Sequence, residues 1–341
     1  MRRILIIFLM VATMSFGAEP PRGFNEVGGS NYVMYEVGRE YLDSGTGWFK
    51  PGVLQPVVAT FHLQKKEDVR QQLKAMHGSG QRKIAIMMWH SHLPRKRMAD
   101  GGIYGHVLAS NGGALTPQHA ENLKGLLALI REDGLFNELV FRFAQQGSVW
   151  SQQWKVWNEE AYKENLKFIL SVRQQICDVL EGSDIKLVFD LGAELGGISK
   201  GSVPEYTRRL WADYTKRFGA NDTLGFSIAA HPGRISNLIE VYDEVGIRPS
   251  RHALDLYKNV PKWMPGMVSE FHAAGIEEPR IIILETFWNS ALSLQEFQQV
   301  ADQFGLTFEY LMQWPWQRDA AHSHYSDVFG QPAYNEYLKK D

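Results

Sequence analysis

The sequence has 341 residues, of which 44% are hydrophobic and 22% charged, a composition typical of a globular protein with a sizeable core. The formal net charge of −2 excludes the strongly basic surface of a nucleic-acid-binding protein, so we expect no nucleic-acid partner. Cys177 is the only cysteine, which excludes an intrachain disulfide bond.

Residues 1–18 have the pattern of a secretory signal peptide. Arg2 and Arg3 supply a positive start. Ile4–Met14 is an apolar run too short to span a bilayer, and Ser15–Ala18 supplies small residues for cleavage. We therefore expect a cleaved signal and a secreted or periplasmic protein, with an uncleaved membrane anchor as the alternative. No later stretch is long and apolar enough to cross a membrane, so no stable span is expected after cleavage.

The remaining sequence alternates short β-branched or aliphatic runs with longer amphipathic stretches. The predicted strands are Val57–His62, Lys83–His90, Glu138–Ala144, Lys186–Glu194, Thr223–Ala230, His252–Tyr257, Arg280–Glu285 and Phe308–Trp314. The predicted helices are Lys66–Met76, Pro117–Glu132, Glu159–Leu180, Pro204–Phe218, Arg234–Val245, Pro261–Ala274, Leu292–Phe304 and Pro332–Lys339. Strict alternation of eight strands with eight helices predicts an α/β protein whose parallel sheet closes into a (β/α)8 TIM barrel.

Residues 19–341 are expected to form one catalytic domain, because no linker or internal repeat divides them. Residues 19–56 precede the first predicted strand and are expected to form an N-terminal capping segment over the barrel. A doubly wound open sheet is the alternative fold. It is disfavoured because no glycine-rich phosphate-binding turn follows the first predicted strand.

Two long inserts follow predicted strands. Residues 91–116 are rich in glycine, histidine and basic residues, and residues 145–158 contain Trp150, Trp154 and Trp157. In a (β/α)8 barrel the loops after the strands form the catalytic face. The inserts therefore predict a binding site on that face.

Every predicted strand ends at a polar or aromatic residue in the phase expected to point into the barrel mouth. These residues are His62, His90, Arg142, Glu194, His231, Tyr257, Glu285 and Trp314. Upstream residues in the same phase are mostly apolar or small, such as Ile84 and Ile86 before His90, and Ile281 and Ile283 before Glu285. Since barrels of this kind place catalysis at this end, the eight side chains are interpreted as a functional site.

Glu194 and Glu285 each end an apolar strand, where an ionisable group costs desolvation free energy. Two carboxylates that face each other across a pocket are the minimum equipment for glycoside hydrolysis: one protonates the leaving oxygen and the other attacks the anomeric carbon or activates water. The alternative is that one of them only forms an ion pair with Arg142. Asp190 and Asp255 point inward at deeper positions and are expected to be buried partners of Arg142 or of histidines.

Carboxylates that end strands four and seven resemble the layout of the large clan of retaining glycoside hydrolases with (β/α)8 barrels, the 4/7 superfamily. The resemblance implies that Glu194 is the acid/base and Glu285 the nucleophile. Tyr257, in Leu-Asp-Leu-Tyr, matches a strand-six tyrosine that hydrogen-bonds the nucleophile. Trp314, in Gln-Trp-Pro-Trp, matches a strand-eight tryptophan under the sugar, and Arg142 takes the place of the arginine near the nucleophile.

One position departs from the clan's pattern. The clan usually has asparagine directly before the strand-four glutamate, where it binds the sugar 2-hydroxyl, and here the residue is Ala193. Either another donor such as His231 replaces that asparagine or the substrate presents its 2-hydroxyl differently. The departure leaves the exact family open.

The sequence thus predicts a secreted, retaining, endo-acting glycoside hydrolase, monomeric and without a metal or organic cofactor. Its partner would be a polysaccharide or oligosaccharide, because indole faces stack well on the apolar faces of sugar rings. The predicted substrate-binding residues are His62, His90, Arg142, Trp150, His231, Tyr257, Trp288, Trp314 and Trp316.

Two other functions stay open from the sequence. In the first, His62, His90, His92 and His231 hold a metal for hydrolysis. The pair His90-Ser-His92 resembles the His-x-His of barrel metallohydrolases, although that motif belongs after strand one and here follows predicted strand two. In the second, the barrel binds glycans without catalysis, since a fold alone does not guarantee activity.

Overall fold

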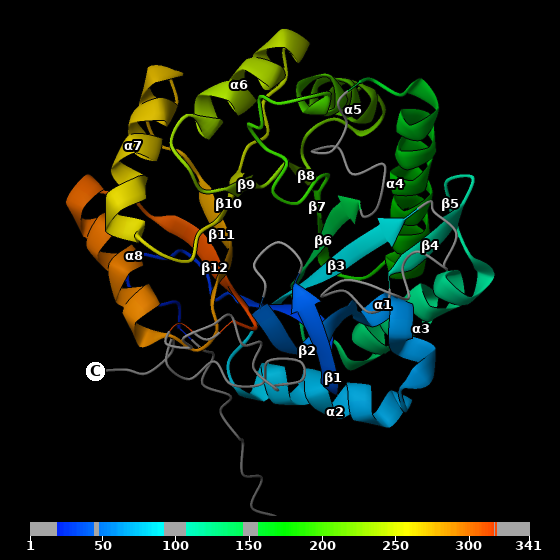
Figure 1. The fold of residues 1–341 in the computed structure, drawn as a ribbon. Coiled ribbons are helices and arrows are strands. Elements are labelled where there is room, and N and C mark those ends of the chain that lie inside the picture. Colours follow the sequence, from blue (N-terminus) through cyan, green and yellow to red (C-terminus); the bar gives the residue numbers. More distant parts are fainter. Residues whose placement is uncertain (1–18, 44–47, 92–106, 146–155, 317, 319–341) are drawn as a thin grey trace, which may run out of the picture.

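The computed structural model describes residues 19–43, 48–91, 107–145, 156–316 and 318, and it shows a parallel sheet curled into a barrel within a ring of helices (Figure 1). The sheet follows the order β8-β7-β6-β3-β1-β12-β11-β10-β9. These strands are β8 (Thr223–Gly225), β7 (Lys186–Asp190), β6 (Glu138–Gln145), β3 (Lys83–Ser91), β1 (Gly29–Asp43), β12 (Phe308–Trp314), β11 (Ile281–Phe287), β10 (His252–Asp255) and β9 (Ile228–Ala229). Only two residues separate β8 from β9, so the two ends of this path belong to one barrel strand, and the predicted α/β barrel is confirmed.

Seven of the predicted helices lie where the sequence placed them, with ends that differ by at most two residues. They are α2 (Lys66–Gly78), α3 (Pro117–Asp133), α4 (Glu159–Leu180), α5 (Val203–Phe218), α6 (Arg234–Val245), α7 (Val260–Ala273) and α8 (Ala291–Phe304). Gly134, Gly246 and Gly305 follow α3, α6 and α8 in the left-handed conformation, which explains why glycine predicted these ends. The predicted helix Pro332–Lys339 lies outside the described residues.

The prediction of the first strand was wrong. Val57–His62 is not a strand: it forms the short helix α1 (Val57–Thr60) and part of the 3-10 helix η1 (Phe61–Leu63). All four residues of α1 are buried, and α1 packs against α3. A short apolar run does not by itself distinguish a buried strand from a buried helical segment, and here packing against α3 selects the helix.

The first barrel strand is instead the start of β1, so residues 19–56 are not a cap. Gly29–Tyr32 pairs in parallel with β3, and Gly29 also pairs with β12. The rest of β1 forms an antiparallel hairpin with β2 (Trp48–Pro56). A Cβ at Gly28 would lie 1.8 Å from the carbonyl oxygen of Leu311, and one at Gly29 would lie 1.7 Å from that of Lys83. The neighbouring strands approach too closely for a side chain, so this strand begins with glycines and lacks a β-branched pattern.

Apolar side chains form two layers, one inside the barrel and one between the barrel and the helices. The inner layer is Ala85, Val140, Val188, Leu224, Ala253, Ile282, Leu284, Tyr310 and Met312. The outer layer joins the other faces of the strands, including Ile84, Ile86, Ile281 and Ile283, to the helices. Two further strands, β4 (Leu108–Asn111) and β5 (Ala114–Leu115), form a small hairpin in the insert after β3.

Among the described residues, no helix is long and apolar enough to cross a membrane.

Candidate active site

The inward phase of β3 was predicted wrongly. Met87 and Trp89 belong to the apolar cluster at the barrel mouth, whereas His90 points outward. The His90 ring contacts Asn165 of α4, with Nε2 2.7 Å from Oδ1, and stacks on Phe168 of the same helix at 4.2 Å. His90 therefore packs in the layer between barrel and helices, and Trp89 occupies the position at the mouth that was predicted for His90.

Glu285 reaches the mouth by a different route from the predicted one. Ile281 and Ile283 face the helices, while Leu284 faces the barrel interior. A register shift against β12 between Ile283 and Thr286 marks a bulge, and a bulge lets two successive residues point to the same side. The Glu285 side chain consequently enters the barrel directly after Leu284.

Two charge-assisted hydrogen bonds hold the Glu285 carboxylate. Arg142 donates from Nη1 to Oε1 at 2.5 Å, and the Tyr257 hydroxyl donates to Oε2 at 2.5 Å. Burial, followed by the negative charge of Glu285, raises the pKa of Tyr257 well above its ordinary value, so this phenol is a hydrogen-bond donor at every relevant pH. Both oxygens of Glu285 are thus fixed, as a group that must attack in one direction requires.

Arg142 lies at the centre of the site and is fully buried. Its Nε donates to Asp190 at 3.1 Å, its Nη2 donates to both oxygens of Asp255 at 2.8 and 3.0 Å, and its Nη1 donates to Asn31 at 3.1 Å. Burial acts to lower the pKa of Arg142, but the carboxylates of Asp255, Glu285 and Asp190 outweigh it and raise this pKa well above the ordinary value. The expectation that Asp190 and Asp255 are buried partners of Arg142 is confirmed.

Glu194 follows β7 in a tight turn and is not part of the strand. Its φ is +61°, a left-handed conformation that is uncommon outside glycine. Its half-buried side chain lies at the mouth, where burial and then the negative charge of Glu285 raise the pKa of Glu194 to about 7, against a smaller opposing effect of Arg142. The two carboxylates therefore share one electrostatic environment, with a proton on Glu194 over part of the neutral range.

Aromatic side chains surround the mouth. Trp314, at the end of β12, packs edge to face on Trp89 with ring centroids 5.7 Å apart. The rings of Trp316 and Tyr257 pack together with centroids 4.9 Å apart. The backbone carbonyl of Trp316 accepts a hydrogen bond from the backbone N–H of Trp288 at 2.8 Å. Three of the predicted tryptophans are thus associated with the strand-seven and strand-eight ends of the barrel. Trp150 lies outside the described residues.

His62 is not at the end of a barrel strand as predicted, whereas His231 does follow β9, at the end of a barrel strand. His62 is exposed on η1 and contacts Asn122 of α3, with Nδ1 2.9 Å from Nδ2. His231 is exposed after β9 and stacks on Trp263 of α7 at 5.3 Å. Together with the outward His90, they contact three different helices, and His92 lies outside the described residues. In the described ranges, no group of three histidine, cysteine or acidic side chains is arranged to hold a metal ion.

The sequence reasoning missed Asn31 and Ser227, which complete the network around Arg142. Asn31 was overlooked because its strand was not recognised. Ser227 lies between β8 and β9 and accepts a hydrogen bond from Arg142 Nη2 at 3.2 Å. Ser227 lies in the predicted inward phase of its strand, but only the last residue of that phase, His231, was predicted to belong to the site.

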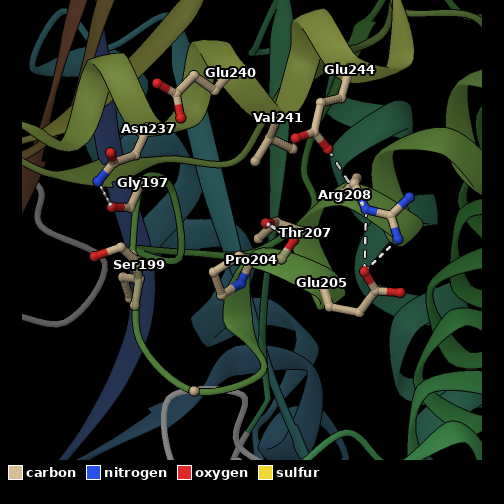
Figure 2. A pocket seen from close by; sticks show the side chains of 12 residues that line it. Gly197, Ser199, Pro204, Glu205, Thr207, Arg208, Asn237, Glu240, Val241 and Glu244 are labelled. Carbon is tan, nitrogen blue, oxygen red and sulfur yellow. Dashed lines mark hydrogen bonds and ion pairs between the residues drawn. The ribbon is translucent and has the colours of Figure 1, made fainter.

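A pocket of about 410 Å³ lies behind the turn that carries Glu194, between α5 and α6 (Figure 2). Its lining includes Gly197, Arg208, Glu205, Asn237 and Glu244, but neither Glu194 nor Glu285. It is therefore separate from the carboxylate pair and borders the outer side of the same turn.

No family model and no curated protein matches this sequence. Solved structures do match. A variant of the GH5_18 enzyme from Streptomyces cattleya, in complex with Manβ1-4GlcNAc, has a TM-score of 0.52 and 12% identity, with 91% of this chain and 79% of that chain covered. A GH113 β-1,4-mannanase has a TM-score of 0.51 and 12% identity, covering 94% and 99%. A GH5_18 enzyme from Bifidobacterium longum subsp. infantis has a TM-score of 0.52 and 10% identity, covering 90% and 78%.

These likenesses show that the chain shares its (β/α)8 fold with glycoside hydrolases of the GH5 and GH113 families. At 10–12% identity they show the fold alone.

Proposed function

We propose that this chain is a retaining glycoside hydrolase in which Glu194 is the acid/base and Glu285 the nucleophile. The observation that carries the proposal is the contrast between the two carboxyl groups. Glu194 has a pKa raised to about 7, whereas Glu285 accepts hydrogen bonds from Arg142 and Tyr257 on its two oxygens. A protonated acid beside a fixed carboxylate is the arrangement that glycoside hydrolysis requires.

The reaction divides into two steps. Glu194 donates its proton to the glycosidic oxygen while a carboxylate oxygen of Glu285 attacks the anomeric carbon, so the glycosidic bond breaks and a glycosyl-enzyme ester forms. Glu194, now ionised, then takes a proton from water, and the water oxygen displaces Glu285. Arg142 stabilises the carboxylate that leaves in the second step.

We further propose an extended sugar substrate cleaved internally, and secretion of the chain directed by residues 1–18. The support for the substrate is the group of aromatic side chains at the mouth, Trp89, Trp314 and Trp316, which suit the apolar faces of sugars. Because similar folds include a β-1,4-mannanase and an enzyme in complex with Manβ1-4GlcNAc, β-mannans are the first substrates to test.

The test is reducing-end release from a polysaccharide panel by the wild type, by Glu285→Gln and by Glu194→Ala. We expect release by the wild type only, and restoration of Glu194→Ala by azide on an aryl glycoside, since azide attacks the glycosyl-enzyme without a general base. The matched control is Glu240→Gln, an exposed glutamate on α6, which should keep full activity. Full activity in Glu285→Gln would exclude it as the nucleophile.

Two further readouts check the mechanism. Proton NMR of the first product should show a retained anomeric configuration, and an inverted product would exclude the covalent step. Because Glu194 must be protonated in the first step, kcat/KM should fall as the pH rises through about 7. A profile flat to pH 9 would remove Glu194 as the acid.

A further inference from the structure

The turn that carries Glu194 is anchored at every backbone amide. Each N–H from residue 191 to residue 196 donates a hydrogen bond, at distances from 2.8 to 3.3 Å. Ser227 accepts two of them: its hydroxyl accepts from the N–H of Glu194 at 2.9 Å, and its carbonyl accepts from the N–H of Gly196 at 2.9 Å. The hydrogen bond from the Glu194 N–H to the Ser227 hydroxyl lies at the residue with positive φ. This bond helps to stabilise the strained conformation, because a buried amide without a partner would favour a different one.

The Ser227 hydroxyl uses all three of its hydrogen-bonding positions. It accepts from the N–H of Glu194 and from Arg142 Nη2 at 3.2 Å, so it must donate its proton to Asp255 Oδ2, 3.0 Å away. The side chain is completely buried, so water does not compete for these positions. The direction of the hydroxyl is therefore fixed by the same Arg142 that binds Glu285.

Helix α6 holds the outer side of the same turn. Arg234 donates to the carbonyl of Glu194 at 3.2 Å, and Asn237 donates to the carbonyl of Gly197 at 3.1 Å, the second of which Figure 2 shows at the edge of the pocket. Ser227 and α6 thus grip the turn from opposite sides. The bonds from α6 reach carbonyl groups, whereas the bond from Ser227 reaches the amide of Glu194 itself.

We propose that Ser227 is a positioning residue that couples the two carboxylates, because its hydroxyl holds the backbone of Glu194 and is itself held by Arg142 and Asp255, the groups around Glu285. The proposal rests on the catalytic roles proposed above, but its structural part does not. Loss of the hydroxyl leaves the Glu194 amide unsatisfied and lets the turn relax outward. The Glu194 carboxyl then becomes more exposed to water, while Glu285 keeps its bonds to Arg142 and Tyr257.

The direct test is an NMR titration of the Glu194 side chain in protein labelled with ¹³C at the glutamate carboxyl groups. The Glu194 signal is assigned as the one that is missing in Glu194→Gln. In Ser227→Ala, we expect the midpoint of this titration to fall by at least one pH unit, since burial is the main cause of its raised pKa. Ser227→Cys keeps the approximate size but bonds weakly, so it should show a fall in the same direction. A midpoint unchanged in both folded variants would overturn the proposal.

The matched control is Ser30→Ala. Ser30 is also a fully buried serine of a barrel strand with two side-chain hydrogen bonds, but its partners are Gln81 and Gln313. Its loss should leave the Glu194 titration unchanged. An equal fall in Ser30→Ala would mean that any damage to the barrel moves Glu194, which would also overturn the proposal.

Kinetics on two aryl glycosides of an accepted sugar provide the second readout. With a poor leaving group, which needs the proton of Glu194, kcat/KM of Ser227→Ala should fall 10- to 100-fold. With a dinitrophenyl leaving group, which needs no proton, it should fall less than about 3-fold. Equal losses on both substrates would mean that Ser227 acts on the fold or on Glu285 and not through Glu194. If the wild type cleaves no glycoside, the proposed function fails, and the NMR titration alone decides the role of Ser227.

Discussion

Replacing Glu194 by glutamine should stabilise the protein at neutral and alkaline pH. In the folded state the pKa of Glu194 is raised from its ordinary 4.5 to about 7, mainly by burial. Between these two values the unfolded chain releases the proton and the folded chain retains it, so folding loses stability as the pH rises from 4.5 to 7. Glutamine has the same size and stays neutral, so it removes this cost while keeping the turn.

The magnitude follows from the pKa difference. At 1.36 kcal/mol per pKa unit, the rise corresponds to at most about 3.4 kcal/mol above pH 7. The side chain is only half-buried, so solvent reduces this value, and we expect about 2 kcal/mol at pH 8. For a barrel of this size, that corresponds to an increase of about 4 °C in Tm. At pH 4.5 the two proteins should differ by less than about 0.5 kcal/mol.

The assay is urea unfolding of the wild type and Glu194→Gln at several values between pH 4.5 and pH 9. Glu240→Gln, which removes an exposed charge from α6, serves as the control for a change in net charge. A stability difference that does not grow with pH, or that matches the control, would refute the idea that burial of Glu194 is costly. Because Glu194 is the proposed acid/base, Glu194→Gln should also be inactive. A variant that is more stable but inactive would show that this carboxyl group is retained for function at the expense of stability.

Three further predictions concern other parts of the barrel. Glu138→Ala should lower the free energy of unfolding by about 3–5 kcal/mol in urea, because it removes the carboxylate that pairs with the buried Arg251, and a loss below about 1 kcal/mol would contradict this. Burial and then Arg248 lower the pKa of His252 to about 4, so the wild type should lose up to about 3 kcal/mol of stability as the pH falls from 6.5 to 4, and His252→Gln should lack that dependence in the same measurement. Gly197→Ala should reduce kcat at least 10-fold in the glycosidase assay, because its Cβ would lie 1.9 Å from a backbone carbonyl oxygen of α6. Gly246→Ala, at a similar φ with nothing within 4 Å, should not.

Seven of the eight barrel strands could be predicted from the sequence because apolar runs of β-branched residues and amphipathic helices alternate regularly. The strand that was not predicted is the start of β1. The neighbouring strands lie so close to Gly28 and Gly29 that no side chain fits there, so this segment lacks the hydrophobic pattern of a strand. The apolar run Val57–Ala59 nearby took its place in the prediction, although the structure buries it as helix. The hydrophobic pattern therefore predicted the alternation of strands and helices, but not that the start of β1 is the strand between β3 and β12.

The carboxylate pair was predicted for partly wrong reasons. Strict alternation along β11 would have turned Glu285 towards the helices, as it does Ile281 and Ile283, and only the bulge brings it to the mouth. The same rule applied to β3 selected His90, which faces α4 because that strand has no bulge before it. Bulges depend on how neighbouring strands pair. The sequence of one strand therefore does not determine whether its last side chains point into the barrel or towards the helices.

The two ends of the barrel treat buried charge in opposite ways. At the ends where the strands begin, Glu138 is surrounded by Lys83, Lys186 and Arg251, and despite burial these cations lower its pKa. At the mouth, one guanidinium, Arg142, faces three carboxylates, and the nearby Glu194 keeps its proton to about pH 7. An excess of cations keeps a carboxylate ionised, whereas at the mouth burial and the neighbouring carboxylates raise the pKa of both Asp255 and Glu194. The first arrangement stabilises the barrel, and the second gives the mouth a carboxyl group, that of Glu194, which exchanges a proton near neutral pH as the proposed acid/base requires.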